Sequence, residues 1–147
     1  MYTEVYKPIA ESGWSIPTNK SVLVVEDDDA ILDSLSTVLR EEGFQVYQAT
    51  NGLEALRMLQ SNQIRPNLIL LDMVMPLMSG AEFLAALEKE STLSDVPVAL
   101  LSAARVETIS PLAVASLAKP VEIDELLEVV HRFADQPIKD LSQRICC

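Results

Sequence analysis

Acidic side chains follow two apolar runs of this chain, and their chemistry suits the binding of a hard divalent cation. Residues 22–25 are followed by Glu26 and Asp27, and residues 68–71 are followed by Asp72. If the two runs form adjacent parallel strands, the three carboxylates lie together at one edge of a sheet. Like charges this close raise one another's pKa unless a cation lies among them. Mg²⁺, which binds carboxylate oxygens and keeps several waters, fits such a cluster better than Ca²⁺ does.

A hydroxyl and an ammonium group follow two further apolar runs. Ser102 comes directly after residues 96–101, and Lys119 comes shortly after residues 114–117. Together with the three acids, these groups suit phosphoryl transfer. The Asp72 carboxylate would be the nucleophile, and Mg²⁺ would neutralise the charge on the transferring oxygens. Lys119 would add a positive charge, and Ser102 would donate a hydrogen bond to a phosphoryl oxygen.

Each of these side chains also has a simpler explanation. Asp72 can be a solvated strand end, Ser102 an ordinary turn hydroxyl and Lys119 a surface charge. The acids after residue 25 can simply begin a helix, because carboxylates are favourable near its positive end. However, Asp28 and Asp29 can fill that role alone.

Strand patterns alternate with helix patterns along the chain, which predicts a parallel α/β sheet with helices on both faces. Runs that are apolar throughout indicate central strands buried on both faces, whereas apolar residues every three or four positions indicate helices. Strands are expected near 21–25, 44–49, 68–72, 96–101 and 114–117, and helices near 28–42, 53–61, 80–90 and 122–133.

Composition and charge narrow the class of protein. The chain has 147 residues, enough for one domain, and is 49% hydrophobic and 22% charged, as globular proteins are. A formal net charge of −11 argues against direct binding to nucleic acid or anionic membranes. The sequence has no apolar stretch of the ~20 residues that span a bilayer and no secretion signal, so we expect a cytoplasmic protein. The two cysteines, Cys146 and Cys147, are adjacent and have no third partner, which excludes a disulfide framework.

Several short segments together resemble the receiver domain of two-component response regulators. The matching pieces are residues 24–28, residues 70–76 with Ser79-Gly80, residues 100–103 and Lys119-Pro120. Each piece alone is a weak signal, but all of them occur in order and at suitable intervals. The resemblance runs from about residue 20 to about residue 135 and so covers most of the chain.

This resemblance implies a flavodoxin-like, doubly wound, five-stranded parallel sheet with strand order 2-1-3-4-5. It also implies a role for each residue at a matching position. These are Asp72 as phosphoacceptor, Glu26 and Asp27 as the acidic pair, the carbonyl of Val74 as a further Mg²⁺ ligand, Ser102 as the switch hydroxyl, and Lys119 as the lysine of the site, before a cis Pro120.

The chain departs from the family's pattern in its C-terminal half. Lys119 follows Ser102 by 17 positions, which is shorter than usual by more than a helical turn, and the segment contains Pro111. The family's fourth helix, which lies between the fourth and fifth strands, is therefore predicted to be shortened, irregular or absent in this chain. Ser116 stands where the family often has a switching Tyr or Phe. Signalling is expected to use another surface, such as the first helix or the aromatic residues of the N-terminal extension.

Two apolar residues near the site predict a long-lived phosphoryl group. Val74 and Ala104 stand where family members often carry polar side chains near the path of a hydrolytic water. Since neither side chain can orient water, spontaneous dephosphorylation is expected to be slow.

The prediction is a single-domain response regulator, with an extension over 1–20, a receiver domain over 21–135 and a tail over 136–147. It would accept a phosphoryl group on Asp72 from a sensor histidine kinase or a phosphotransfer protein in a phosphorelay. It would catalyse only its own phosphorylation and dephosphorylation, and act through contacts with a downstream protein target. The tail is too short for an effector domain. A second copy of the chain is a further candidate partner.

Three alternatives remain at this stage. A pseudo-receiver would bind proteins without phosphorylation, and Mg²⁺ binding by the acids would speak against it. A phosphatase with an aspartyl nucleophile would need an Asp-x-Asp motif after the first strand, which Glu26-Asp27-Asp28 fits poorly. A nucleotide-binding protein would need a glycine-rich loop there, where this chain has acids.

Overall fold

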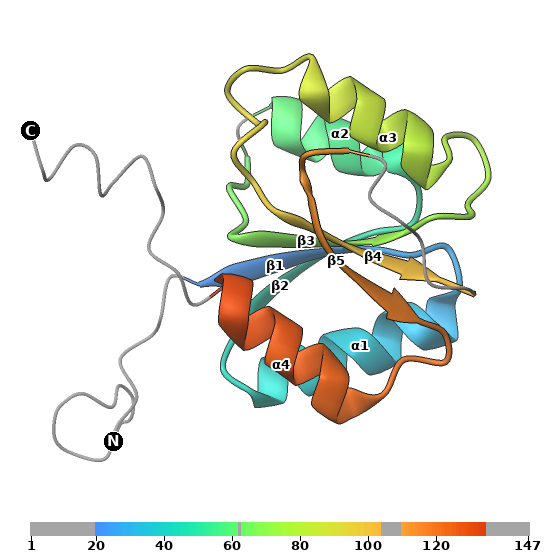
Figure 1. Ribbon diagram of the computed structural model, residues 1–147, viewed down its shortest axis with the longest axis vertical. Coiled ribbons are helices and arrows are strands. Elements are labelled where there is room, and N and C mark those ends of the chain that lie inside the picture. Colours follow the sequence, from blue (N-terminus) through green and yellow to red (C-terminus); the bar gives the residue numbers. More distant parts are fainter. Residues whose placement is uncertain (1–19, 62, 104–109, 135–147) are drawn as a thin grey trace, which may run out of the picture.

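Five parallel strands form a single sheet at the centre of the protein (Figure 1). The computed structural model describes residues 20–61, 63–103 and 110–134. The strands are β1 (Ser21–Val25), β2 (Gln45–Ala49), β3 (Leu68–Asp72), β4 (Val98–Ser102) and β5 (Ala113–Ala118). Their order across the sheet is β2-β1-β3-β4-β5, which confirms the predicted flavodoxin-like arrangement.

Helices cover both faces of this sheet. They are α1 (Asp29–Glu41), α2 (Gly52–Gln60), α3 (Gly80–Glu88) and α4 (Ile123–Ala134). Figure 1 shows α2 and α3 on one face, and α1 and α4 on the other. None of these four helices is long and apolar enough to cross a membrane.

The central strands are apolar throughout because successive side chains enter opposite hydrophobic clusters. In β1, Leu23 and Val25 pack in the cluster that includes residues of α2 and α3. Their neighbours Val22 and Val24 pack in the cluster that includes residues of α1 and α4. Every residue of β1 and β3 is buried, so the polar groups that follow these strands are held by a rigid core.

Local capping fixes both ends of α1 and the start of α3. Asp28 is the N-cap of α1 and accepts a 3.0 Å hydrogen bond from the Ile31 N–H. Ser79 and Glu82 form a capping box at the start of α3. Gly43, with φ of 98°, follows the end of α1 in the left-handed conformation that favours glycine. Since Asp28 caps α1, the helix does not need Asp27 for this purpose.

Two features of the C-terminal half differ from, or extend, the prediction. β4 begins at Val98 instead of residue 96, because Pro97 has no N–H to donate to the sheet. The helix predicted to be shortened, irregular or absent between β4 and β5 is a different one from α4. Most of its segment, residues 104–109, lies outside the described residues. Residues 110–112, the described part of that segment, form a bend and a turn before β5. The Lys119-Pro120 peptide bond is cis, as expected.

Candidate functional site

The sheet brings the predicted acids together at its carboxyl edge. β1 and β3 are adjacent parallel strands with Val25 paired to Leu71, so Glu26 and Asp72 follow on neighbouring strands. One carboxylate oxygen from each of Glu26, Asp27 and Asp72 lies within 4.8 Å of the other two. Glu26 is fully buried, Asp72 is 3% exposed and Asp27 is exposed to solvent. The cluster is therefore a mostly buried group of acids that remains open on the Asp27 side.

Lys119 reaches this cluster from the end of β5. Its Nζ lies 3.1 Å from Glu26 Oε1 and 3.2 Å from Asp72 Oδ1. Its backbone N–H donates a 2.7 Å hydrogen bond to the carbonyl of Ser102, the last residue of β4. The predicted hydroxyl and ammonium residues are thus neighbours at the same edge as the acids, and the ammonium bridges the two buried carboxylates.

Backbone N–H groups hold the two buried carboxylates from the outer side. The Asp28 N–H donates to Glu26 Oε2 over 3.2 Å. The Val74 N–H donates to Asp72 Oδ1, also over 3.2 Å. Val74 itself is 78% exposed, so it contributes through its backbone. Sequence reasoning missed both contacts, because the direction of a backbone N–H in a loop depends on dihedral angles that side-chain types do not reveal.

Burial and neighbouring charges shift the pKa values of two groups of the site, Glu26 and Lys119. Burial disfavours the charged form of Glu26, and repulsion from Asp72 adds to it, so the pKa of Glu26 is raised above 4.5 in spite of Lys119. Partial burial also opposes the charge of Lys119, but the two carboxylates outweigh it and raise the pKa of Lys119 above 10.5. Because folded Glu26 holds its proton more tightly than unfolded Glu26, its stabilising contribution is lost as the pH rises through that raised pKa.

The donor set fits Mg²⁺. All three side chains offer carboxylate oxygens, the ligands that this cation prefers. Glu26 Oε1 is buried, and the Lys119 ammonium that lies 3.1 Å from it is shared with Asp72. Two buried carboxylates with one ammonium between them keep a net negative charge, which is costly unless a further cation compensates it. The exposed side of Asp27 leaves a route for the ion from solvent.

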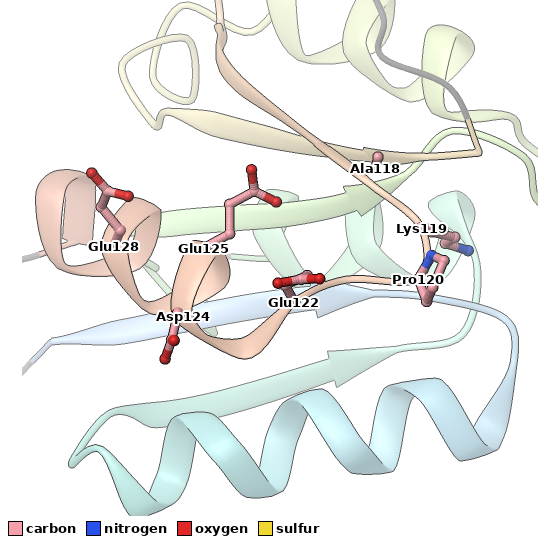
Figure 2. Close-up of a pocket in the computed structure, with 7 residues that line it drawn as sticks. All are labelled: Ala118, Lys119, Pro120, Glu122, Asp124, Glu125 and Glu128. Atoms are coloured by element: carbon pink, nitrogen blue, oxygen red, sulfur yellow. The ribbon is translucent and has the colours of Figure 1, made fainter.

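A hollow of about 630 Å³ lies beside this cluster, but it is a different place. It is lined by Ala118, Lys119, Pro120 and four acids from the first half of α4 and the residue before it: Glu122, Asp124, Glu125 and Glu128. In Figure 2 these acids point in different directions, and the Lys119 side chain points away from them. The hollow therefore does not gather its charged groups around one ligand position, whereas the cluster at Asp72 does.

The loop after Asp72 contains a strained turn. The Met78 N–H donates a 2.7 Å hydrogen bond to the Pro76 carbonyl, which closes a three-residue turn around Leu77. Leu77 has φ of 70°, and among the described residues it is the one residue other than glycine with positive φ. A turn of this kind is rare and strained. The Leu77 side chain is 77% exposed, so burial of that side chain does little to offset the strain.

We expect Leu77→Gly to stabilise the protein by up to about 1 kcal/mol, because glycine tolerates this backbone conformation. The gain is limited by the greater conformational entropy of glycine in the unfolded chain. Urea denaturation measures the change. Val74→Gly, which also removes an exposed aliphatic side chain but at negative φ, is the matched control and should show no gain. Equal gains in the two variants would contradict a strained Leu77.

Comparison with known proteins gives a family match and similar folds. The family model of the response regulator receiver domain matches residues 22–131. Sporulation initiation phosphotransferase F of Bacillus subtilis is 34% identical over 118 residues, which are 78% of this chain and 94% of that protein. The response regulator TrrA of Thermotoga maritima, solved in complex with Mg²⁺ and BeF, has a TM-score of 0.68 and 34% identity, covering 78% of this chain and 98% of that one.

Longer proteins also match. The probable transcriptional regulator ycf29 of Pyropia yezoensis is 36% identical over 117 residues, which cover 76% of this chain and 52% of that protein. The transcriptional regulatory protein PrrA of Mycobacterium bovis is 41% identical over 115 residues, covering 75% and 48% respectively. The chain thus spans about half the length of these two regulators.

Proposed function

Because this chain belongs to the receiver-domain family of two-component response regulators, we propose that Asp72 accepts a phosphoryl group from a sensor histidine kinase or a phosphotransfer protein. Receiver domains are signalling modules and work with such donors. The observation that carries the proposal is the placement of Asp72, a nearly buried carboxylate that Lys119 and the Val74 N–H orient within a cluster of acids. The alignment with a phosphotransferase along almost its whole length supports it.

The contacts of Asp72 suggest how the transfer proceeds. Oδ1 is fixed by the Lys119 ammonium and the Val74 N–H, which leaves Oδ2 to attack phosphorus. A bond forms between Oδ2 and phosphorus while the phosphorus–nitrogen bond of a donor phosphohistidine breaks. A donor imidazole that is protonated on its other nitrogen leaves as the neutral ring. Asp72 then carries an aspartyl phosphate.

The other residues of the site would manage the charge of this step. We propose that Glu26, Asp27, Asp72 and the carbonyl of Val74 hold Mg²⁺, which supplies positive charge next to the phosphoryl oxygens when bound. Lys119 would exchange its contact with Asp72 for one with the new phosphoryl group. The hydroxyl of Ser102, which is half-buried at the end of β4, would donate a hydrogen bond to the same group.

These new contacts would shift the protein between two conformations. We propose residues 21–135 as the receiver domain, with 1–20 and 136–147 as flanking segments, and output through protein contacts. The net charge of −11 supports protein contacts over direct binding of nucleic acid by this domain, because phosphates would be repelled. The matched region covers about half of each transcriptional regulator. The regulatory output of those whole proteins is therefore not part of what we propose for this receiver domain.

The test is incubation with acetyl phosphate and Mg²⁺, followed by intact mass. We expect a mass gain of one phosphoryl group that requires both Mg²⁺ and Asp72, so Asp72→Asn should stay unmodified. Asp33→Asn is the matched control, because Asp33 is an exposed acid on α1. Beryllofluoride, which mimics a phosphoryl group, provides a second assay through the change in tryptophan fluorescence on its addition. If the wild-type protein shows neither a mass gain with acetyl phosphate nor a fluorescence change with beryllofluoride, the proposal fails. The protein would then be a phosphorylation-independent binding module.

The aspartyl phosphate is expected to be long-lived. The exposed Val74 side chain is a hydrocarbon and cannot position a water molecule for attack on phosphorus. Val74→Asn would supply an amide at the same place that can orient a water molecule by hydrogen bonding, and it should shorten the half-life several-fold. Loss of the mass gain over time, after removal of acetyl phosphate, measures the half-life. Rapid loss in the wild type that Val74→Asn does not accelerate would contradict this reasoning.

A further inference from the structure

The conformation of the loop over residues 73–79 determines how Asp72 is oriented. This loop supplies the Val74 N–H that donates to Asp72 Oδ1, and it contains the strained turn around Leu77. A strained turn persists only where surrounding contacts fix it. One such contact is the 3.1 Å hydrogen bond from the Gly80 N–H to the Met73 carbonyl, at the start of α3. A second contact must hold the loop on its other side.

The structure provides that second contact between Met78 and Gly52. Gly52 is the buried first residue of α2, and the side chain of Met78 lies directly over it. A Cβ added at residue 52 would lie 2.9 Å from Met78 Cγ and 3.1 Å from both Met78 Cβ and Met78 Sδ. Met78 Cβ moves only with the loop backbone, and Cγ and Sδ move only by a rotamer change that disturbs the packing of Met78 against the hydrophobic cluster. A side chain at residue 52 would therefore shift the loop or dislodge the Met78 side chain that holds it.

The backbone of Gly52 does not itself require glycine. Among the described glycines, Gly43 is the one with positive φ, and Gly52 begins a regular helix. Alanine could adopt the same backbone conformation at this position, because φ is not positive there. The absence of a side chain at this position is thus explained by the space that Met78 occupies. This contact joins α2 to the loop that carries the backbone partner of Asp72.

We propose that Gly52 is a positioning residue for phosphorylation of Asp72. Because Gly52 has no side chain, Met78 can pack directly over it. This contact positions the loop so that the Val74 N–H donates its hydrogen bond to Asp72 Oδ1. The proposal rests on the proposed function of Asp72 and deepens it, because it assigns a role to a residue on another helix that touches none of the reacting groups.

A double-mutant cycle tests this proposal with Gly52→Ala, Met78→Ala and the double variant. The first readout is the amide NMR signal of Val74 in metal-free protein, and the second is the rate of mass gain with acetyl phosphate across a Mg²⁺ titration. In the wild-type background, Gly52→Ala should move the Val74 signal and slow phosphorylation about threefold or more, because small misplacements of reacting groups are costly. In the Met78→Ala background the contacts with Cγ and Sδ are gone and only the 3.1 Å contact with Cβ remains, so Gly52→Ala should have a clearly smaller effect on both readouts.

The cycle separates a positioning role from a structural one. Circular dichroism and urea denaturation establish that all four proteins are folded under the assay conditions. If Gly52→Ala has no effect in the wild-type background, or the same effect in both backgrounds, the proposed role of the contact is overturned. If wild-type protein takes up no phosphoryl group, the function of Asp72 fails, and the Val74 signal alone then decides whether Gly52 places the loop. Normal phosphorylation in Gly52→Ala would leave the function of Asp72 intact and overturn only the role of Gly52.

Discussion

Lys119→Met is expected to lower the free energy of unfolding by about 2 to 3 kcal/mol at pH 7 in EDTA, and Mg²⁺ is expected to restore most of this loss. The Lys119 ammonium lies within 3.2 Å of an oxygen of Glu26 and of Asp72, whose side chains are 1% and 4% exposed. Its removal leaves two buried carboxylates side by side with no cation. One of them must then take up a proton, or both remain charged at a high cost in desolvation.

The pKa shift of Lys119 determines the pH range in which Lys119→Met destabilises the protein. The carboxylates raise the pKa of Lys119 above 10.5, so the folded state holds this proton more tightly than the unfolded state does. The stabilising contribution is complete below pH 10.5 and is lost as the pH rises through the raised pKa. The effect of Lys119→Met is therefore fully developed at pH 7 and should shrink in strongly alkaline solution.

Urea denaturation with EDTA and with Mg²⁺ measures both parts of this prediction. Mg²⁺ should stabilise Lys119→Met more than it stabilises the wild type, because the ion no longer competes with the ammonium for the same carboxylates. Lys89→Met is the matched control. Lys89 is an exposed lysine at the end of α3, and its loss should change stability by less than about 0.5 kcal/mol. A loss in Lys119→Met that is equally large in EDTA and in Mg²⁺ would show that the ammonium does not serve the acidic cluster.

Gly80→Ala is expected to destabilise the protein by about 2 to 3 kcal/mol and to impair phosphorylation of Asp72. A Cβ at this position would lie 2.7 Å from Met73 Cα and 2.9 Å from the carbonyl oxygen of Asp72. Both are backbone atoms, of Asp72 and of the residue after it, so the overlap cannot be relieved by a change of side-chain rotamer. The start of α3 must move away from β3, or the end of β3 must shift with Asp72.

Gly43→Ala provides an informative control for this prediction. Gly43 has φ of 98°, and an added Cβ there would meet no atom within 4 Å. Its replacement should cost about 1 kcal/mol through backbone strain alone, and should leave the rate of mass gain with acetyl phosphate unchanged. Urea denaturation and the mass assay together distinguish the two glycines. If Gly80→Ala gains mass with acetyl phosphate as fast as Gly43→Ala does, close approach of α3 to the end of β3 is not required for phosphorylation.

The sequence alone predicted the fold and the polar residues that meet at the edge of the sheet, from local patterns together with the resemblance to receiver domains. Residues 22–25 and 68–71 are apolar at every position, as strands buried on both faces are, and the strand order that the resemblance implies makes Glu26 and Asp72 neighbours. Asp28 and Gly43 marked the ends of α1 through their own capping and backbone preferences. Parallel connection then directed all strand ends to one edge.

The tertiary structure alone decided how the site is held together. It buries Glu26 and exposes Asp27, although the two acids are neighbours in sequence, and it places the Lys119 ammonium between Glu26 and Asp72. It also seats Met78 over Gly52. These contacts join residues far apart in the chain, and they depend on how helices and loops pack against the sheet. Residue types and their spacing assigned Lys119 to the site, but they do not give the distances, the burial of each acid or the contact of Met78 with Gly52, because these depend on that packing.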